Sequence, residues 1–183
     1  MAPMDQSADD QTTVWTIGHS TRTLDELVAL LREHQITRLL DIRRVPGSRH
    51  NPQYGQGALA ESMPKHDIEY EHAKGLGGLR HTTKDSPNTG WRNASFRGYA
   101  DYMQTADFAS AIDQLIAEAE QQRTVIMCAE AVPWRCHRSM VADALIVRGV
   151  HVVDIMGPGK TSDEKLTSFA HAEGTTVTYP PEV

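Results

Sequence analysis

Apolar and polar positions alternate along the chain in stretches that are typical of strands followed by helices. The run TVWTI, residues 13–17, predicts a short strand. In the next stretch, TLDELVALLREH, apolar residues recur at helical spacing from Leu24 to Leu31. Thr23 is placed to cap this helix, and Glu26 is placed to complete a capping box. The first part of the chain therefore predicts a strand followed by an amphipathic helix.

The same alternation continues after this helix and returns in the second half of the chain. TRLLDI, residues 37–42, predicts a second strand, and a strand, a helix and a strand with short connections make the two strands parallel. Residues 108–122 predict a helix, residues 124–130 a buried strand, residues 137–148 a helix that stops at Gly149, and residues 150–155 a final strand.

The middle of the chain is less regular. Residues 43–57 and 74–98 are rich in Gly, Pro, Asn and Ser and predict two long loops. A short helix is expected at residues 58–63 and a third strand at 68–72. Loops of such length in a compact domain are often functional.

This order of elements predicts an α/β fold: a single compact three-layer domain, Rossmann-like, with a mainly parallel sheet and helices on both faces. We expect residues 1–12 to be a disordered tail and residues 13–156 to form the domain. Residues 157–183 are expected to be an extension that packs on the domain or is partly disordered. In such sheets ligands bind at the carboxyl ends of the strands.

Composition narrows the class of protein. The chain has no apolar run of membrane-spanning length and no signal-peptide pattern at its start, so no membrane partner is expected. Two cysteines and seven methionines among 183 residues suit a reducing compartment, and we predict a cytoplasmic protein. The formal net charge of −6 argues against broad nucleic-acid affinity but leaves room for a local basic cleft.

The stretch VIMCAEAVPWRCHRSM, residues 125–140, holds both cysteines, Cys128 and Cys136. A cysteine between a strand end and a helix start is close to the positive end of the helix dipole. Arg135, His137 and Arg138 add positive charge that would favour a thiolate. The alternative is that Cys128 is a small buried hydrophobe at the end of a strand.

Three known kinds of cysteine site fit this stretch poorly. A phosphatase loop needs C-x5-R, but Trp134 stands where the arginine should be, and Arg135 comes one residue late. The spacing C-x7-C-H is not a familiar zinc pattern. A disulfide between the two cysteines is geometrically feasible, although the spacing is not the C-x-x-C of thiol oxidoreductases.

Arginines also cluster directly after the second predicted strand, in DIRRVPGSRHNPQY. Asp41, Arg43, Arg44 and Arg49 belong to this segment. Strand alternation would put Arg43 and Arg44 on opposite faces, so that only one could enter a given pocket. Arginine suits phosphate or carboxylate. The alternative, which can hold at the same time, is an Asp41–arginine salt bridge that fixes the loop.

Glycine-rich segments add weaker signals. GHS, residues 18–20, could be a backbone turn beside a ligand or a plain strand-to-helix turn. GLGGLR, residues 75–80, misses G-x-G-x-x-G but suggests close approach of the backbone to another group. GPGKT, residues 157–161, is not a P-loop because Asp154 stands where glycine is required. The aromatics of residues 91–103 either stack bases or cap the core, and we favour the core.

Taken together, TIGHSTRTLDELVALL, LLDIRRVPGSR, IEYEHAKGLGG, FRGYADYM and MCAEAVPWRCHR resemble the uncharacterised domain of unknown function 488 family over roughly residues 13–156. The resemblance implies a compact α/β domain and no particular reaction. The residues that match the positions of the family's motifs are Gly18, His19, Ser20, Asp41, Arg43, Pro46, Ser48, Arg49, Gly77, Gly78, Tyr99, Cys128, Glu130, Cys136, His137 and Arg138.

We therefore expect an enzyme with a polar pocket at the carboxyl edge of the sheet, acting on a small anionic, nucleotide or nucleic-acid-derived substrate. Cys128 or Glu130 would react, and His19 or His137 would move protons. The expected anion- or substrate-binding residues are Gly18, Ser20, Asp41, Arg43, Ser48, Arg49, Gly77, Gly78, Tyr99, Cys136 and Arg138.

Other hypotheses use the same residues. A glutamate nucleophile near arginines would suit glycosyl transfer to or from a nucleoside. The pocket could instead bind a nucleotide or nucleic acid without chemistry, or Cys128 and Cys136 could form a thiol redox switch. No cofactor and no metal site is predicted, and the pattern does not predict an oligomeric state.

Overall fold

The computed structural model describes residues 11–47, 49–78 and 80–181. The main elements are β1 (Thr13–Gly18), α1 (Leu24–Glu33), β2 (Arg38–Asp41), α2 (Gln56–Ser62), β3 (Glu69–His72), α3 (Ala94–Tyr102), α4 (Ala106–Gln121), β4 (Thr124–Cys128), α5 (Arg138–Ile146), β5 (His151–Gly157), β6 (Lys160–Asp163), β7 (His171–Glu173) and β8 (Thr176–Thr178). Short 3-10 helices lie at Pro52–Tyr54, Met63–His66, Lys74–Leu76 and Pro133–Arg135.

A six-stranded sheet forms the centre of the molecule, in the order β3-β2-β4-β1-β5-β6. β1 to β5 are all parallel to one another, and β6 pairs with β5 in the antiparallel direction. β1 and β2 run in the same direction as expected, but β4 lies between them and pairs with both. The chain has the α/β fold with a mainly parallel sheet that its pattern predicts.

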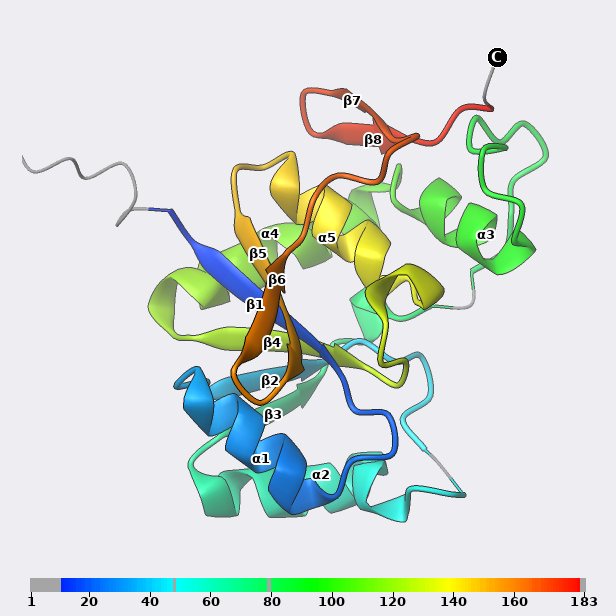
Figure 1. Cartoon of the computed structure of the whole chain (residues 1–183). Helices are drawn as coiled ribbons and strands as arrows, with labels where there is room; N and C mark the ends of the chain where they lie inside the picture. The colour runs from blue at the N-terminus through cyan, green and yellow to red at the C-terminus, as the bar shows by residue number, and fades with distance from the viewer. Residues whose placement is uncertain (1–10, 48, 79, 182–183) are drawn as a thin grey trace, which may run out of the picture.

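Helices cover both faces of this sheet and make three layers (Figure 1). Side chains of β1, β2 and β4 alternate between two cores. Ile17 and Met127 pack with α1 and α2, whereas Val14, Ile126 and Cys128 pack with α3, α4 and α5. Because successive residues of a strand point to opposite faces, a strand buried on both sides is apolar throughout, as β4 is.

The capping box predicted for the first helix is present. The Thr23 hydroxyl accepts a hydrogen bond from the Glu26 N–H at 3.1 Å, and the Glu26 carboxylate accepts one from the Thr23 N–H at 3.0 Å. These bonds satisfy two backbone donors that a helix start otherwise leaves open. α1 therefore begins where its sequence says it does.

The second long loop is shorter than predicted, because α3 occupies its end. The Asn93 side chain caps this helix by accepting from the N–H groups of Ser95 and Phe96, at 2.8 and 3.2 Å. Gly98 lies inside the helix, where a Cβ would come within 2.0 Å of the Arg80 carbonyl oxygen. Gly98, which contributed to the prediction of a loop, is needed because the helix packs closely against the backbone of Arg80.

The segment after β5 contains strands that its weak pattern does not indicate. The GPGKT segment turns the chain from β5 into the antiparallel strand β6. Further on, β7 and β8 form a hairpin beside α5 (Figure 1). Buried Tyr179 donates a hydrogen bond to Asp143 of α5 at 2.7 Å, and its backbone N–H donates to Asn88 at 2.9 Å. Residues 157–181 are thus attached to the domain.

The expected tail at residues 1–12 falls largely outside the described residues; within them, the Thr12 carbonyl accepts from the His151 N–H at 2.9 Å. Over the described ranges, no helix combines the length and the apolar character needed to cross a membrane.

Candidate active site at the carboxyl edge of the sheet

A cavity of about 640 Å³ opens where β1, β2 and β4 end. Loops from these strands meet residues of α3 and the start of α5 there. Its lining consists of His19, Ser20, Thr21, Arg43, Arg44, Val45, Gly47, Asn51, Gly78, Ser95, Phe96, Tyr99, Cys128, Ala129, Glu130, Arg135, Cys136 and His137.

Most residues singled out in the sequence meet in this cavity. His19, Ser20, Arg43, Gly78, Tyr99, Cys128, Glu130, Cys136 and His137 all line it. Gly18, Asp41, Gly77, Arg49 and Arg138 are not part of the lining. Ser48 lies outside the described residues. The fold thus brings together residues from five separate segments, and those that follow β1, β2 and β4 meet as parallel topology predicts.

Cys128 and Cys136 are both free thiols, and they lie next to each other. Cys128 is the last residue of β4, and Cys136 precedes α5 by two residues. Only 1% of Cys128 and 7% of Cys136 is exposed, although both sulfur-bearing residues line the cavity. Their side chains share a hydrogen bond. The two thiols therefore form one chemical unit at the floor of the cavity.

The hydrogen bond from Cys136 lowers the pKa of the Cys128 thiol below its ordinary value. The positive charge of Arg138 acts in the same direction, against the effect of burial. As a neutral thiol, Cys128 donates to the Glu130 carbonyl oxygen at 3.6 Å. The same shared hydrogen bond, together with burial, raises the pKa of Cys136. The two shifts run in opposite directions, which favours Cys128 as the more acidic thiol of the pair.

His137 lies next to Cys136, and its hydrogen bonds fix its ring in a single tautomer. Its Nε2 lies 2.9 Å from the Ile42 carbonyl oxygen and 3.1 Å from that of Leu76. Carbonyl oxygens only accept, so Nε2 carries the hydrogen and Nδ1 carries the lone pair. Nδ1 lies 3.5 Å from the Cys136 sulfur. Burial lowers the pKa of His137 to about 4, so this imidazole is neutral near pH 7.

His19 stands at the end of β1, stacked on Tyr54 with ring centroids 4.2 Å apart. Its Nδ1 lies 2.8 Å from the Ser20 carbonyl oxygen, so Nδ1 donates and the lone pair is on Nε2. Arg43 approaches Nε2 at 3.3 Å. Burial lowers the pKa of His19, and the charge of Arg43 lowers it further. His19 is thus a neutral acceptor held against a guanidinium.

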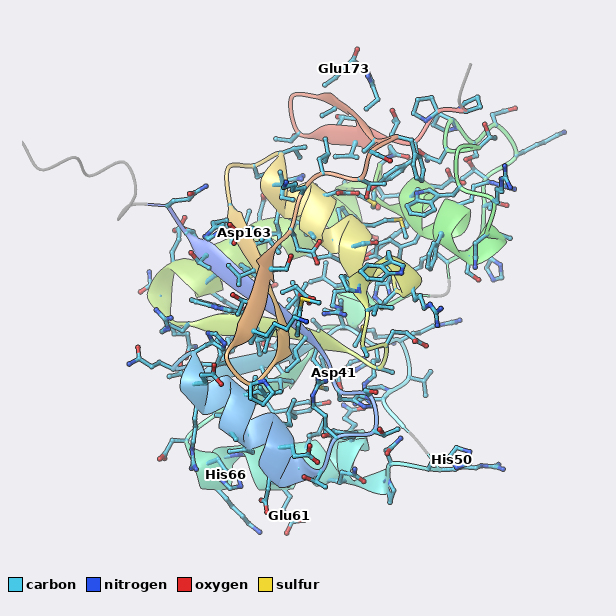
Figure 2. The ribbon with its side chains drawn as sticks, in the orientation of Figure 1. Asp41, His50, Glu61, His66, Asp163 and Glu173 are labelled. Carbon is cyan, nitrogen blue, oxygen red and sulfur yellow. The ribbon has the colours of Figure 1, made fainter. Side chains whose placement is uncertain are left out.

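Asp41 and Arg43 form the salt bridge that was the alternative interpretation of the arginine cluster. Arg43 donates through Nε and Nη2 to the two oxygens of Asp41, at 2.9 and 2.6 Å, and also to the Tyr54 carbonyl at 2.6 Å. Asp41 lies inside the molecule, whereas His50 of the following loop points outward (Figure 2). This pair fixes the loop after β2.

The expectation that Arg43 and Arg44 would lie on opposite sides of the sheet is wrong, because both line the cavity. β2 ends at Asp41, so strand alternation no longer governs the residues that follow. Arg43 is buried and Arg44 is exposed. One arginine therefore belongs to the floor of the cavity and the next to its rim.

Arg138 is a structural residue beneath the cavity. Its side chain is fully buried and pairs with Asp154 of β5 at 2.7 Å. It also donates to the Thr16 hydroxyl and to the carbonyl oxygens of Glu130 and Ala131, at 3.1, 3.0 and 3.3 Å. These contacts hold the loop after β4 in place, and they leave Arg138 below the lining instead of on the surface that a ligand would meet.

Two glycines are explained by close approach to other parts of the site. A Cβ on Gly18 would come within 1.6 Å of the Glu130 carbonyl oxygen, so β1 and the loop after β4 touch through their backbones. A Cβ on Gly78 would lie 3.0 Å from Nδ1 of His137. The GLGGLR segment thus does approach another group closely, and that group is the imidazole of His137.

The rim of the cavity carries charge and exposed apolar surface. Arg44, Arg135 and Glu130 are exposed there, and the side chain of Val45 is 75% exposed. Trp134, beside Arg135, is 64% exposed. Cations on the rim above an apolar and aromatic wall suit a ligand with an anionic group and a flat or apolar part.

Several lining residues escaped the sequence reasoning. Ser95 and Phe96 reach the cavity from α3, a helix whose glycine concealed it. Tyr54 lies outside the lining but supports His19 and accepts from Arg43, and it comes from a segment that was predicted only as loop. Arg135 was expected to add positive charge near the thiols but was not among the predicted binding residues, and its position next to Cys136 was the available signal. Thr21, Val45, Gly47, Asn51 and Ala129 gave no signal of their own.

The described residues contain no group of three or more His, Cys, Asp or Glu side chains that could hold a metal ion. The chemistry available to these residues is that of the two thiols, the two imidazoles, the rim carboxylate and the arginines.

Comparison with known proteins adds one relationship. Residues 23–145 match the model of a family described as Domain of unknown function DUF488. Neither the curated proteins nor the solved structures contain a match to this chain.

Proposed function

Because this chain belongs to the DUF488 family, whose description names no reaction, we propose a function from its pocket: an enzyme whose Cys128 thiolate reacts with a small anionic or nucleotide-derived substrate. The observation that carries this proposal is the pair of free thiols that line one cavity, with the charge of Arg138 lowering the pKa of Cys128. A thiolate is the nucleophilic form of cysteine.

The surroundings of Cys128 support a reacting role. An inert structural cysteine needs only apolar neighbours, whereas Cys128 has a second thiol and a buried guanidinium near its sulfur. The sequence hypothesis that Cys128 only ends a strand accounts for its burial but not for these polar contacts. Cys136 supports the thiolate as a hydrogen-bond donor.

In this proposal, exposed residues at the rim of the cavity bind the substrate. Arg43 is saturated by Asp41 and the Tyr54 carbonyl, and Arg138 is buried below the cavity. Arg44 and Arg135 are the exposed cations of the lining, and they outnumber the single carboxylate, Glu130. We therefore assign the anionic part of the substrate to Arg44 and Arg135.

Glu130 and His19 are the groups proposed to move protons. The Glu130 side chain is exposed at the rim, two residues beyond the nucleophile, and it can exchange protons with solvent. His19 presents the lone pair of Nε2 close to Arg43, in the same cavity. The two free thiols suit a reducing compartment, and a cytoplasmic location is part of this proposal.

The test is alkylation of the native protein with iodoacetamide across pH, with each cysteine mapped by mass spectrometry. We expect Cys128 to be modified faster than Cys136 and at a pH below the ordinary range of a thiol, ~8.5. Cys128→Ser should remove the fast phase. Equal, slow modification of both cysteines would contradict the proposal.

The substrate class is tested by protection in the same assay. A nucleoside monophosphate or inorganic phosphate should slow alkylation of Cys128 by occupying the cavity. Arg135→Gln should reduce this protection, whereas Arg32→Gln, a matched change at the far end of α1, should not. Protection that is the same in both variants would exclude Arg135 as the anion contact.

Burial favours a second candidate, a nucleotide or nucleic-acid binding module without chemistry. Cys128 is 1% exposed, which limits its access to a bulky substrate. A binding module predicts affinity for nucleotides that falls steeply with salt and survives Glu130→Gln and Cys128→Ser. Measurement of binding by calorimetry in these variants separates it from the enzyme.

A further inference from the structure

We propose that Cys128 and Cys136 are a redox-active dithiol that reduces a small hydroperoxide and closes to a disulfide. This inference rests on the proposed thiolate character of Cys128, and it names a substrate class for the same sulfur. It goes beyond a nucleophile acting on an anionic substrate, because it gives Cys136 a bond-forming role.

The placement of the two sulfurs supports this role. Cys128 ends β4 and Cys136 precedes α5, so the chain leaves the sheet at one thiol and enters the next helix just after the other. The thiols share a hydrogen bond within the wall of one cavity. A disulfide needs its two cysteines close together before oxidation, since a larger separation would require backbone movement.

The segment between the cysteines is suited to a small adjustment. Ala129, Glu130 and Ala131 are exposed, and so are Trp134 and Arg135. Its ends are held by the backbone, because the N–H of Cys136 donates to the Pro133 carbonyl and the N–H of Ser20 donates to that of Ala129. Formation of a disulfide therefore affects an exposed loop and leaves the sheet unchanged.

Because the two sulfurs are buried, only a small oxidant can reach them. The sulfurs are almost covered, yet they line a cavity with an exposed mouth at Val45 and Arg135. A hydroperoxide group can reach a floor that excludes a large electrophile. Reactive thiols of redox proteins have thiolate character and a second cysteine beside them, and both features are present here.

The reaction balances in two steps. The Cys128 thiolate attacks the terminal oxygen of the hydroperoxide, an S–O bond forms and the O–O bond breaks. The alcohol leaves after taking a proton, and Cys128 becomes a sulfenic acid. The sulfur of Cys136 then attacks Cys128, the S–S bond forms and the S–O bond breaks. The hydroxyl leaves as water with the proton of Cys136. The peroxide gains two electrons and the two thiols lose them.

His137 orients Cys136 for the second step. Its Nδ1 lies 3.5 Å from the Cys136 sulfur, so its lone pair can accept the S–H of Cys136 once that proton is no longer donated to the Cys128 thiolate. Its Nε2–H is donated to two carbonyl oxygens, which hold the ring in this orientation. Gly78 packs against the same nitrogen and keeps it in place. His137 is a positioning residue here, because it acts on the thiol and not on the peroxide.

The experiment treats the reduced full-length chain with one equivalent of hydrogen peroxide and then counts thiols under denaturing conditions. We expect the count to fall from two to zero, with a mass loss of two hydrogens and a peptide that links Cys128 to Cys136. Dithiothreitol should restore both thiols. In Cys136→Ser, Cys128 should stop at the sulfenic acid, which dimedone traps. In Cys128→Ser, the remaining thiol should persist.

The outcomes separate this inference from the proposed function. A wild-type protein that alkylates rapidly at Cys128 but keeps two thiols after peroxide overturns the dithiol alone. Slow alkylation of Cys128 overturns both. A disulfide that links two chains overturns the intramolecular pairing. If either variant fails to fold, dimedone trapping and peptide mapping of the wild-type protein give the same decision.

Discussion

Cys128 and His137 owe their chemistry to neighbours that are distant in the sequence. Cys128 ends a strand that is apolar throughout, and its thiolate is favoured by Cys136 and Arg138 from the following turn and helix. His137 is neutral because it is buried and because Ile42 and Leu76 hold its Nε2 hydrogen. The pKa of these two side chains thus depends on neighbours that only the folded chain brings close to them.

The buried imidazole predicts how stability depends on pH. The pKa of His137 is about 4 in the folded chain, below its ordinary value of 6.5. The unfolded chain therefore binds more protons between these values, and the free energy of unfolding should fall as pH drops from about 6.5 to about 4. The loss is at most ~3 kcal/mol. Burial of His19 acts in the same direction.

Urea denaturation at a series of pH values measures this effect. His137→Gln removes the titrating group, so its free energy of unfolding should change less over this range than that of the wild-type protein. An identical pH dependence in the two proteins would show that His137 is not held neutral by the fold.

Among the elements, α1 and α3 differ in how clearly the sequence pattern predicts them. α1 has a capping box and apolar residues at helical spacing, and it begins at its predicted position. α3 contains Gly98 and follows a loop, so its pattern is concealed, and only the Asn93 cap marks its start. Ser95 and Phe96 were missed as lining residues for this reason.

The cap of α1 gives a prediction at this scale. Thr23→Ala removes the acceptor for the Glu26 N–H and should lower the free energy of unfolding by ~1 kcal/mol. Thr23→Ser keeps the hydroxyl and should retain most of the stability. Thermal unfolding followed by circular dichroism measures both, and equal stability of the alanine and serine variants would contradict the capping role.

At the scale of the whole molecule, the buried ion pair between Arg138 and Asp154 connects α5, β5, β1 and the loop after β4. Arg138 starts α5, Asp154 belongs to β5, and Thr16 of β1 donates to the same carboxylate at 2.7 Å. The arginine also holds two carbonyl oxygens of the loop after β4. The position of the site thus depends on a network below it.

Arg138→Met should lower the free energy of unfolding by roughly 3–5 kcal/mol, because it leaves Asp154 buried without its cation. The double variant Arg138→Met, Asp154→Leu removes both charges and should recover much of this loss. Chemical denaturation tests the pair. A stable single variant that only loses ligand binding would restore Arg138 to the anion-binding residues.

The sequence by itself determined the α/β class, the strands β1 to β5, the helix α1 and the convergence of Cys128, His19 and Arg43 on one edge. These features follow from local periodicity, capping and the direction of parallel strands, which depend on residues near one another in the chain. Only the tertiary structure decided that β4 lies between β1 and β2, that Arg138 is buried, that Arg43 is paired with Asp41, and that the two thiols meet. Burial and pairing depend on what packs from distant segments, and no local pattern records that.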